Sequence, residues 1–379
     1  APASLPPASY VTRWAPFAAP AAVAMRQVLV LRMPVAAGDP LHDALDRGLI
    51  EAMRARGIRV IEADGEPAPG LGLAAVLAAQ TAAHGRFERI VLRLGDGAAW
   101  PDAALDTAWL ERLGHGWSAL ASLPAEAPPV LVSGAAQPRW PAVLACVDKE
   151  RAGPALTWLD CEPGLGEAGL DSLLDAHLDA LLAIREPACR LTRAGLEVPR
   201  LAAAAPLPAA AFRARDAHAY LVSGGLGGVG ARVLGWLLEQ GARHVVSLNR
   251  RAPDAAEAAA LERLARRHAA RIDTLDLGLD DPEALREALR ATLGGTPLAG
   301  VFHCAAVLDD QPFAAQAWDA AREVLRPKGA GAWHLHRATL GQPLDHFVVF
   351  SSLSALLGQP GQAAYALAKS YLAYAIRRG

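Results

Sequence analysis

The chain has 379 residues, of which 53% are hydrophobic and 20% are charged, and its formal net charge is -2. This length predicts two domains rather than one, and the lack of a basic excess argues against nucleic-acid binding. No apolar run reaches the length of a membrane span and no signal-peptide pattern is present, so the sequence predicts a cytoplasmic protein that binds no membrane. Because the chain begins Ala-Pro-Ala-Ser without a methionine, we expect it to be cut from a longer polypeptide.

Cysteine and histidine spacing predicts no metal centre. The four cysteines are scattered and include no Cys-x-x-Cys pair, which indicates reduced thiols and no zinc site. His334 and His336 are two residues apart on an expected helix, so their side chains point apart and make a poor pair of ligands.

Strands alternate with helices along the first half of the chain. The expected strands are Gln27–Arg32, Ile58–Glu62, Arg89–Leu94, Pro129–Ser133 and Ala155–Leu159, and the expected helices are Leu41–Arg56, Leu71–His84, Ala103–Leu123 and Leu170–Ile184. This alternation predicts a parallel sheet with helices on both faces. The first strand is followed by no phosphate cradle, so we expect a structural partner for the second half. The Pro- and Ala-rich segment Leu201–Pro208 is the expected linker between domains 1–210 and 211–379.

The second half opens on a glycine-rich turn between a strand and a helix. Residues 220–230 read YLVSGGLGGVG, in which an apolar strand passes through the glycines into an amphipathic helix at about Gly228–Gln240. Glycines let backbone N–H groups approach a pyrophosphate, and the positive end of the helix faces that anion. A glycine turn without a ligand is the alternative. The predicted dinucleotide contacts in this turn are Ser223, Gly225, Leu226, Gly227 and Gly230.

The other predicted cofactor contacts follow three further strands. Strand His244–Leu248 is followed by Asn249, Arg250 and Arg251, where dinucleotide folds meet the adenosine ribose. Two arginines and no acid there favour NADPH over NADH, with a solvated basic turn as the alternative. The other predicted contacts follow strands Ile272–Leu275 and Gly300–His303 and are Asp276, Leu277, Cys304 and Ala305. His303 itself is expected to be a core histidine.

A proton-donating pair lies on the last expected helix. Strand His346–Phe350 leads to Ser352, and the helix that begins near Gln362 carries Tyr365 and Lys369 on one face. An ammonium group beside a phenol stabilises the phenolate, and a serine hydroxyl can hydrogen-bond a substrate oxygen. These groups suit the reduction of a carbonyl, although Tyr365 and Lys369 taken alone would be an ordinary surface pair.

In this order the motifs resemble the short-chain dehydrogenase/reductase superfamily. The segments YLVSGGLGGVG, N-R-R, H-C-A-A-V-L-D-D, F-S-S and G-Q-A-A-Y-A-L-A-K resemble in particular the ketoreductase domains of modular polyketide synthases. The resemblance implies an α/β fold with two Rossmann-like, doubly wound parallel-sheet subdomains: a truncated structural one (1–210) and a catalytic one that binds NADPH (211–379). It implies that Tyr365 protonates the new alkoxide, that Ser352 polarises the ketone, and that Lys328 in R-P-K-G-A-G-A-W is the family's helix lysine.

The chain departs from the family pattern at two places. The family usually carries Asn four residues after the tyrosine, where this chain has Lys369 in addition to Lys328. Two ammonium groups near one phenol repel each other, and the sequence leaves open which lysine serves Tyr365. The chain also ends at Gly379, within the tyrosine helix, whereas the family continues with a strand, a lid helix and closing sheet elements. We therefore expect the catalytic subdomain to be incomplete at its C-terminus.

The resemblance also implies a substrate and partners. Leu308, Asp309 and Asp310 resemble the L-D-D fingerprint of B-type members, which steer the substrate toward the D (3R) alcohol. The implied activity is NADPH-dependent reduction of the β-keto group of a polyketide acyl thioester tethered to an acyl carrier protein, beside other domains of the same, homodimeric synthase. Three alternatives stay open: a non-catalytic structural ketoreductase-like domain, a free-standing short-chain carbonyl reductase, and alcohol oxidation.

Overall fold

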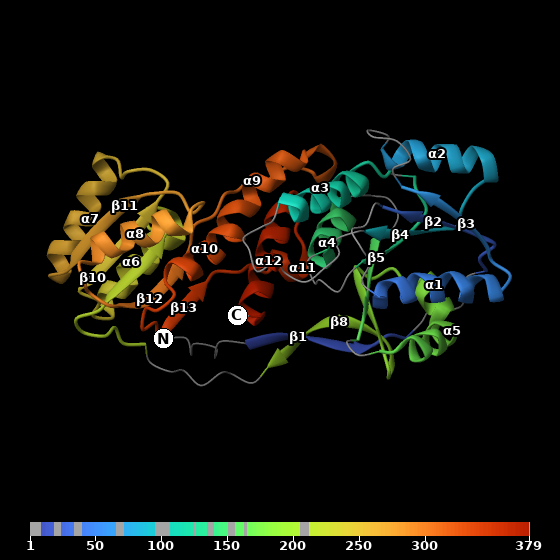
Figure 1. Cartoon of the computed structure of the whole chain (residues 1–379), viewed down its shortest axis with the longest axis horizontal. Helices are drawn as coiled ribbons and strands as arrows, with labels where there is room; N and C mark the ends of the chain where they lie inside the picture. The colour runs from blue at the N-terminus through green and yellow to red at the C-terminus, as the bar shows by residue number, and fades with distance from the viewer. Residues whose placement is uncertain are drawn as a thin grey trace, which may run out of the picture. The chain divides into compact units, whose positions relative to one another are not determined.

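The computed structural model describes residues 9–18, 24–33, 40–65, 72–94, 107–124, 126–134, 140–150, 156–162, 165–204 and 212–378. The chain forms two compact units (Figure 1). The first unit comprises Ala1–Pro208, Asp310–Trp318 and Ser354–Ala366, and the second comprises Ala209–Asp309, Asp319–Leu353 and Leu367–Gly379. Two short segments from the second half of the sequence therefore belong to the first unit, and the division into functional subdomains at residue 210 stays a prediction.

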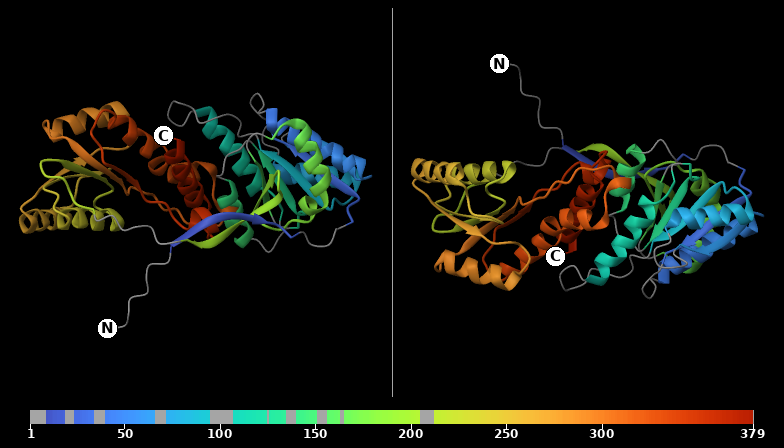
Figure 2. Two further views of the ribbon diagram at one scale, coloured as in Figure 1. Left: turned by 90° about the horizontal axis from the view of Figure 1, so that it is seen from below. Right: turned by 90° about the horizontal axis from the view of Figure 1, so that it is seen from above.

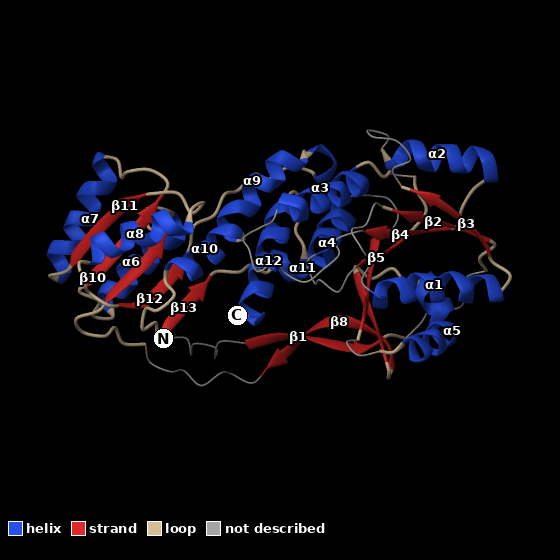
Figure 3. Cartoon of the chain, viewed as in Figure 1, coloured by secondary structure: helices blue, strands red, loops and turns tan. Residues whose placement is uncertain are grey.

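An eight-stranded sheet, whose strands are red in Figure 3, forms the centre of the first unit. Its strand order is β1-β8-β7-β6-β5-β4-β2-β3. Its strands are β1 (Ser9–Pro16), β2 (Gln27–Arg32), β3 (Arg59–Asp64), β4 (Arg89–Leu94), β5 (Val130–Gly134), β6 (Leu156–Cys161), β7 (Ala188–Thr192) and β8 (Gly195–Ala204). Its helices are α1 (Pro40–Ala55), α2 (Leu73–His84), α3 (Thr107–Ala121), α4 (Trp140–Glu150) and α5 (Glu167–Ala183). Strands β2 to β7 run parallel, as the sequence predicts.

The antiparallel edge of this sheet is a difference from the prediction. Strand β8 pairs antiparallel with β7 and with β1, in a register that sets Ser9 opposite Ala204. Residues 201–204 are therefore strand and not linker, because pairing with a distant segment gives their backbone groups hydrogen-bond partners. Residues 205–208 of the expected linker lie outside the described part of the chain.

Helix α4 was not predicted from the sequence, and its burial explains why. Its residues 142–147 are all buried, as is Trp140. A helix that is apolar around its whole circumference shows no 3.6-residue polar period, which is the signal that reveals surface helices.

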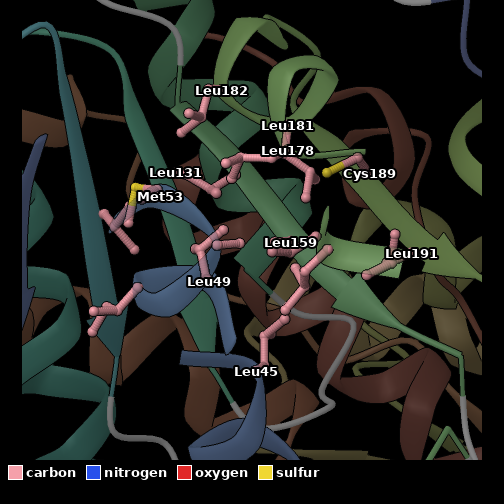
Figure 4. Packing of buried hydrophobic residues seen from close by; sticks show 14 of the residues in the cluster. Leu45, Leu49, Met53, Leu131, Leu159, Leu178, Leu181, Leu182, Cys189 and Leu191 are labelled. Atoms are coloured by element: carbon pink, nitrogen blue, oxygen red, sulfur yellow. The ribbon is translucent and has the colours of Figure 1, made fainter. Parts of the chain in front are cut away.

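The main core of the first unit lies between the sheet and helices α1 and α5 (Figure 4). Leu45, Leu49 and Met53 recur every four residues on α1 and form one apolar stripe. They pack with the leucines of α5 against Leu131 of β5 and Leu159 of β6.

The second unit is built on a five-stranded sheet with the order β11-β10-β9-β12-β13, in which all pairs are parallel. Its strands are β9 (Ala219–Ser223), β10 (His244–Asn249), β11 (Arg271–Asp276), β12 (Leu298–His303) and β13 (His346–Val349). The helices of the second half are α6 (Gly228–Glu239), α7 (Ala255–His268), α8 (Pro282–Leu293), the short η1 (Phe313–Ala315), α9 (Trp318–Lys328), α10 (Ala330–Ala338), α11 (Ser354–Leu357) and α12 (Ala363–Arg378).

Alternate residues of β9 serve opposite faces of this sheet. Tyr220 and Val222 pack with the apolar side of α6, whereas Leu221 packs with α8 and α10. Figure 2 shows the yellow and gold helices α6 and α7 on one face and the orange helix α8 on the other. Helices on both faces of a parallel sheet confirm the predicted doubly wound α/β class.

Candidate active site

The glycine turn joins β9 to α6 at the carboxyl edge of the second unit's sheet. Gly224 has a φ of 72°, and a Cβ atom there would lie 2.8 Å from Cα of Ala305. A Cβ atom on Gly230 would lie 2.0 Å from the carbonyl oxygen of Gly224. These two positions require glycine because backbone atoms approach them directly. A Cβ atom on Gly228, in contrast, would meet nothing within 4 Å, so this side of the turn has room for a ligand.

The first turn of α6 points toward this open side. The helix begins after Gly227, which supplies no side-chain cap, whereas Asp254 and Asp281 cap α7 and α8 through their carboxylates. The first N–H groups of α6 are therefore served by no capping side chain, and the positive end of the helix dipole adds to their attraction for an anion. The turn and the helix end together fit a dinucleotide pyrophosphate.

Asn249 ends strand β10, beside the turn. Its Oδ1 accepts a hydrogen bond from the backbone N–H of Leu226 at 3.1 Å, and its Nδ2 donates to Oγ of Ser247 at 3.0 Å. On the neighbouring strand end, the N–H of Leu277, which follows Asp276, donates to the carbonyl oxygen of Asn249 at 2.8 Å. The amide of Asn249 thus holds the turn against β10, and direct cofactor contacts by these residues stay a prediction.

The two arginines after β10 differ in their surroundings. Arg251 donates to both carboxylate oxygens of Glu257 at 2.6 Å, and this lowers the pKa of Glu257 to about 2. Arg250 is exposed and forms no ion pair with any residue that the structure describes. The guanidinium of Arg250 is therefore available to an incoming anion, that of Arg251 already binds Glu257, and a cofactor contact by either arginine stays a prediction.

Ser223 links the ends of β9 and β12. Its carbonyl oxygen accepts from the N–H of Cys304 at 3.0 Å, and its Oγ lies 2.7 Å from Nδ1 of His303. Burial, and then the charge of Lys328, lowers the pKa of His303 to about 3, so the ring is neutral and belongs to the core, as expected. Burial also raises the pKa of the Cys304 thiol to about 11, so this residue presents a small neutral side chain at the sheet edge.

Two buried lysines reach the ends of the neighbouring strands β12 and β13. Lys328, the last residue of α9, is 1% exposed, and its Nζ donates to the carbonyl oxygen of His303 at 3.4 Å. Lys369 of α12 is 3% exposed and donates to the carbonyl oxygen of Phe350 at 2.5 Å. Burial first, and then the positive charge of Lys369, lowers the pKa of Lys328 to about 7. The doubled lysine therefore produces the expected repulsion, and near neutral pH part of the Lys328 population has no charge.

The other two predicted catalytic residues, Ser352 and Tyr365, lie after strand β13 and in the first turn of helix α12. Ser352 follows β13 and is partly buried, and Tyr365 is partly buried in the first turn of α12, one turn before Lys369. Asp310 accepts a hydrogen bond at Oδ2 from Nε2 of Gln362 at 3.0 Å. Gln362 is not among the site residues that the sequence predicts, and its place directly before the tyrosine helix is the only signal for it in the sequence.

The predicted substrate-orienting residues lie on one short loop. Leu308 is 63% exposed, and Asp309 and Asp310 follow it. The carboxylate of Asp310 is hydrogen-bonded to Gln362, and the effect of the loop on a substrate stays a prediction.

Neither a metal cluster nor a membrane helix is found in the described ranges. Among the described side chains, no group of three His, Cys, Asp or Glu residues is arranged to hold a metal ion. Over the same residues, no helix is both long and apolar enough to cross a bilayer.

Comparison with known proteins matches residues 218–378 to the family described as the KR domain. Over 162 residues the chain is 40% identical to a mycocerosic acid synthase-like polyketide synthase of Mycobacterium tuberculosis, a match that covers 42% of this chain and 8% of that protein. Over 197 residues it is 38% identical to 6-methylsalicylic acid synthase of Aspergillus niger, a match that covers 46% of this chain and 11% of that protein. The chain thus spans about a tenth of the length of these relatives.

Solved structures resemble nearly the whole chain. A structure described as A-type ketoreductases from a modular polyketide synthase has a TM-score of 0.71 and 29% identity, over 96% of this chain and 78% of that one. The first ketoreductase of the tylosin synthase has a TM-score of 0.73 and 24% identity, over 97% of this chain and 78% of that one, and shows the fold alone. Domains of this family are oxidoreductases that bind a nicotinamide cofactor, which the open glycine turn fits. These likenesses confirm the predicted family over residues 218–378: this part of the chain matches the KR domain, and the relatives and solved structures that it resembles are polyketide synthases and their ketoreductase domains.

Proposed function

We propose that this chain uses NADPH to reduce the β-keto group of an acyl thioester carried by an acyl carrier protein. The observation that carries the proposal is the second unit's sheet edge, where the open turn at Gly228 and two buried lysines occur at the ends of neighbouring parallel strands. Ligands of doubly wound sheets bind at this edge. The proposed partners are the carrier protein and the other domains of a cytoplasmic, homodimeric synthase.

The proposed roles of the residues follow from their chemistry. NADPH, when bound, supplies a hydride to the carbonyl carbon. Ser352 donates a hydrogen bond to the carbonyl oxygen, and Tyr365 gives its hydroxyl proton to the alkoxide that forms there. Hydride and proton together convert the ketone to the alcohol, and the nearby lysine charge favours the phenolate left on Tyr365. The backbone around Gly227 and the first turn of α6 would hold the pyrophosphate.

Arg250 supports NADPH over NADH. It follows the strand that meets the adenosine ribose in dinucleotide folds, it is exposed, and no described residue pairs with it. A 2′-phosphate would supply two oxygens to its guanidinium.

The stereochemistry of the reduction is proposed to be B-type, because Leu308, Asp309 and Asp310 resemble the fingerprint of members that steer the substrate toward the D (3R) alcohol. The solved relative at 29% identity is described as A-type, so the configuration of the product discriminates between the two. We expect the D (3R) alcohol when the product is resolved on a chiral column.

The test of the function is NADPH oxidation at neutral pH with a β-ketoacyl thioester. Tyr365→Phe removes the proton donor and is expected to lower kcat by roughly 10²–10⁴-fold. Tyr371→Phe, on the same helix, is the matched control: it removes a buried hydroxyl that has no part in the proposed proton transfer, so kcat is expected to stay within about twofold of the parent. Equal rates for Tyr365→Phe and the parent would refute the catalytic assignment.

A second candidate is a structural ketoreductase-like domain without turnover, and the doubled lysine, which departs from the family pattern, favours it. This candidate predicts NADPH binding, seen by fluorescence titration, with no oxidation of any thioester. Oxidation of small free ketones but not of carrier-bound chains would instead indicate a free-standing carbonyl reductase.

A further inference from the structure

The last residue of α4, Glu150, joins two distant segments of the first unit. Its Oε2 accepts a hydrogen bond from the backbone N–H of Phe313 at 2.5 Å, and its Oε1 accepts from the N–H of Gly361 at 2.8 Å. These partners are 163 and 211 residues further along the chain. A carboxylate bonded to two backbone N–H groups forms the stronger, charge-assisted kind of hydrogen bond, so Glu150 fixes the spacing between the two segments.

Both segments border residues of the proposed active site. Phe313 follows Asp310 by three residues, and Gly361 precedes Tyr365 by four. The segments also contact each other directly: the N–H of Gln311 donates to the carbonyl oxygen of Gly361 at 2.9 Å, and Gln362 donates to Asp310 at 3.0 Å. Glu150 therefore belongs to a network of hydrogen bonds that connects Asp310, at the end of the L-D-D loop, with Gln362, the residue just before α12.

The rest of α4 holds the segment before Tyr365 in the same way. Lys149 donates from Nζ to the carbonyl oxygens of Leu357 at 2.6 Å and Gly358 at 3.0 Å, and the N–H of Gln359 donates to Sγ of Cys146 at 3.3 Å. Gly358 has a φ of 66°, and a Cβ atom there would lie 2.5 Å from the carbonyl carbon of Ala145. The chain can approach α4 this closely only with glycine at this position.

We propose that Glu150 is a positioning residue for the reduction, which it serves by fixing the loop that carries Asp310 relative to the first turn of α12, where Tyr365 lies. The proposal rests on the proposed function, because only a reaction at Tyr365 gives this spacing a catalytic consequence. In this proposal a helix from the first half of the sequence, α4, positions two segments from the second half that adjoin Asp310 and Tyr365.

The experiment compares Glu150→Gln and Glu150→Ala with the parent chain. Glu150→Gln keeps the shape and one acceptor oxygen, and Glu150→Ala loses both bonds. The matched control is Glu111→Gln, because Glu111 lies exposed on α3 with no hydrogen bond in the described structure. Two readouts are taken: amide hydrogen exchange of residues 311–316 and 357–362, and kcat and KM for NADPH with a β-ketoacyl thioester.

We expect exchange at Phe313 and Gly361 to become at least tenfold faster in Glu150→Ala, with Glu150→Gln intermediate and Glu111→Gln unchanged. We expect kcat to fall about tenfold in Glu150→Ala while KM for NADPH stays within twofold, because a misplaced proton donor slows the reaction without touching the cofactor turn. A loss of stability alone would raise exchange along the whole chain and change both kinetic constants.

Unchanged exchange in either segment would overturn the proposal, and so would an equal loss of kcat in Glu111→Gln. A parent chain that oxidises no NADPH would refute the proposed function instead. The exchange readout alone would then decide whether Glu150 fixes the two segments, with faster exchange in Glu150→Ala supporting that role and unchanged exchange excluding it.

Discussion

Neighbouring residues of one type can have different tasks, and the pair Arg250 and Arg251 is an example. Both follow β10, but Arg251 is already bound through two hydrogen bonds to Glu257. Glu257 also completes the capping box of α7 with Asp254. Arg251 thus supports the start of a helix, and Arg250 is left for a ligand.

We expect Arg250→Ala to raise KM for NADPH by roughly 10-fold or more, because a charge-assisted hydrogen bond contributes about 1.5–3 kcal/mol. KM for NADH should not change. Arg251→Ala is the matched control and should leave KM for NADPH nearly unchanged while lowering the thermal stability slightly. Steady-state kinetics with both cofactors check this prediction, and an equal rise in both variants would contradict it.

Lys328 illustrates the cost of burying a second ammonium group. Its pKa in the folded chain is about 7, below the ordinary value of 10.5. At pH values between these two pKa values, the unfolded chain binds more protons at Lys328 than the folded chain does. The free energy of unfolding therefore rises with pH from about 7, and the contribution of Lys328 is least favourable below pH 7.

We therefore expect Lys328→Met to be more stable than the parent by roughly 1–3 kcal/mol at pH 6.5, and the difference to shrink steadily toward pH 10. Urea unfolding at several pH values measures it. A difference that does not depend on pH would show that the substitution acts through packing and not through the charge.

At the scale of elements, the turn between β9 and α6 has two sides, one packed against the protein backbone and one open. The inner side is closed, since a Cβ atom on Gly230 would lie 2.0 Å from a carbonyl oxygen. The outer side at Gly228 is open. Gly230 is therefore required by the packing of the turn, whereas Gly228 is left free to meet a ligand.

Three alanine substitutions along α6 test this separation. Gly230→Ala should lower the midpoint of thermal unfolding by several degrees, because the clash with Gly224 involves backbone atoms. Gly228→Ala should keep the parent stability but weaken NADPH binding about tenfold or more, because the added methyl occupies the phosphate side of the turn. Gly235→Ala, where a Cβ atom meets nothing within 4 Å, should stabilise the helix by about 0.8–1 kcal/mol and leave binding unchanged. Calorimetry measures the stability of the three variants, and fluorescence titration measures their NADPH binding. A Gly228→Ala variant that binds NADPH as the parent does would contradict the assignment of the open side of the turn to the phosphate.

At the scale of the whole molecule, the first unit is completed by segments from the second half of the sequence. Trp117 of α3 donates to the carbonyl oxygen of Gln316 at 2.9 Å. Its ring lies 4.5 Å from that of Phe313 and 5.9 Å from that of Trp318. Together with the contacts of Glu150, these attach residues 310–318 to the first unit, with Phe313 and Gln316 buried.

A fragment of residues 1–208 should therefore not reproduce the stability of the first unit. Without the segments that cover it, the ring of Trp117 would be exposed, and burial of a large apolar side chain contributes about 1.5–3 kcal/mol. We expect the fragment to bind a hydrophobic dye strongly and to unfold at a lower temperature than the full chain. A fragment that matched the full chain in both measurements would contradict this account.

The sequence by itself determined the alternation of strands and helices, apart from α4 and the antiparallel edge of the first sheet, as well as the glycine turn at 224–230 and the family. These signals are local: alternation along a strand, the apolar stripe of a surface helix, and glycines at fixed spacing are all readable within a few residues. Only the tertiary structure decided that β8 pairs with β1, that α4, with residues 142–147 buried, is a helix, that Arg251 is already paired, and that Glu150 joins residues 313 and 361. Each of these depends on which side chains meet after the chain has folded, and the contacts of Glu150 connect positions more than 160 residues apart, a separation at which no pattern in the sequence carries the pairing.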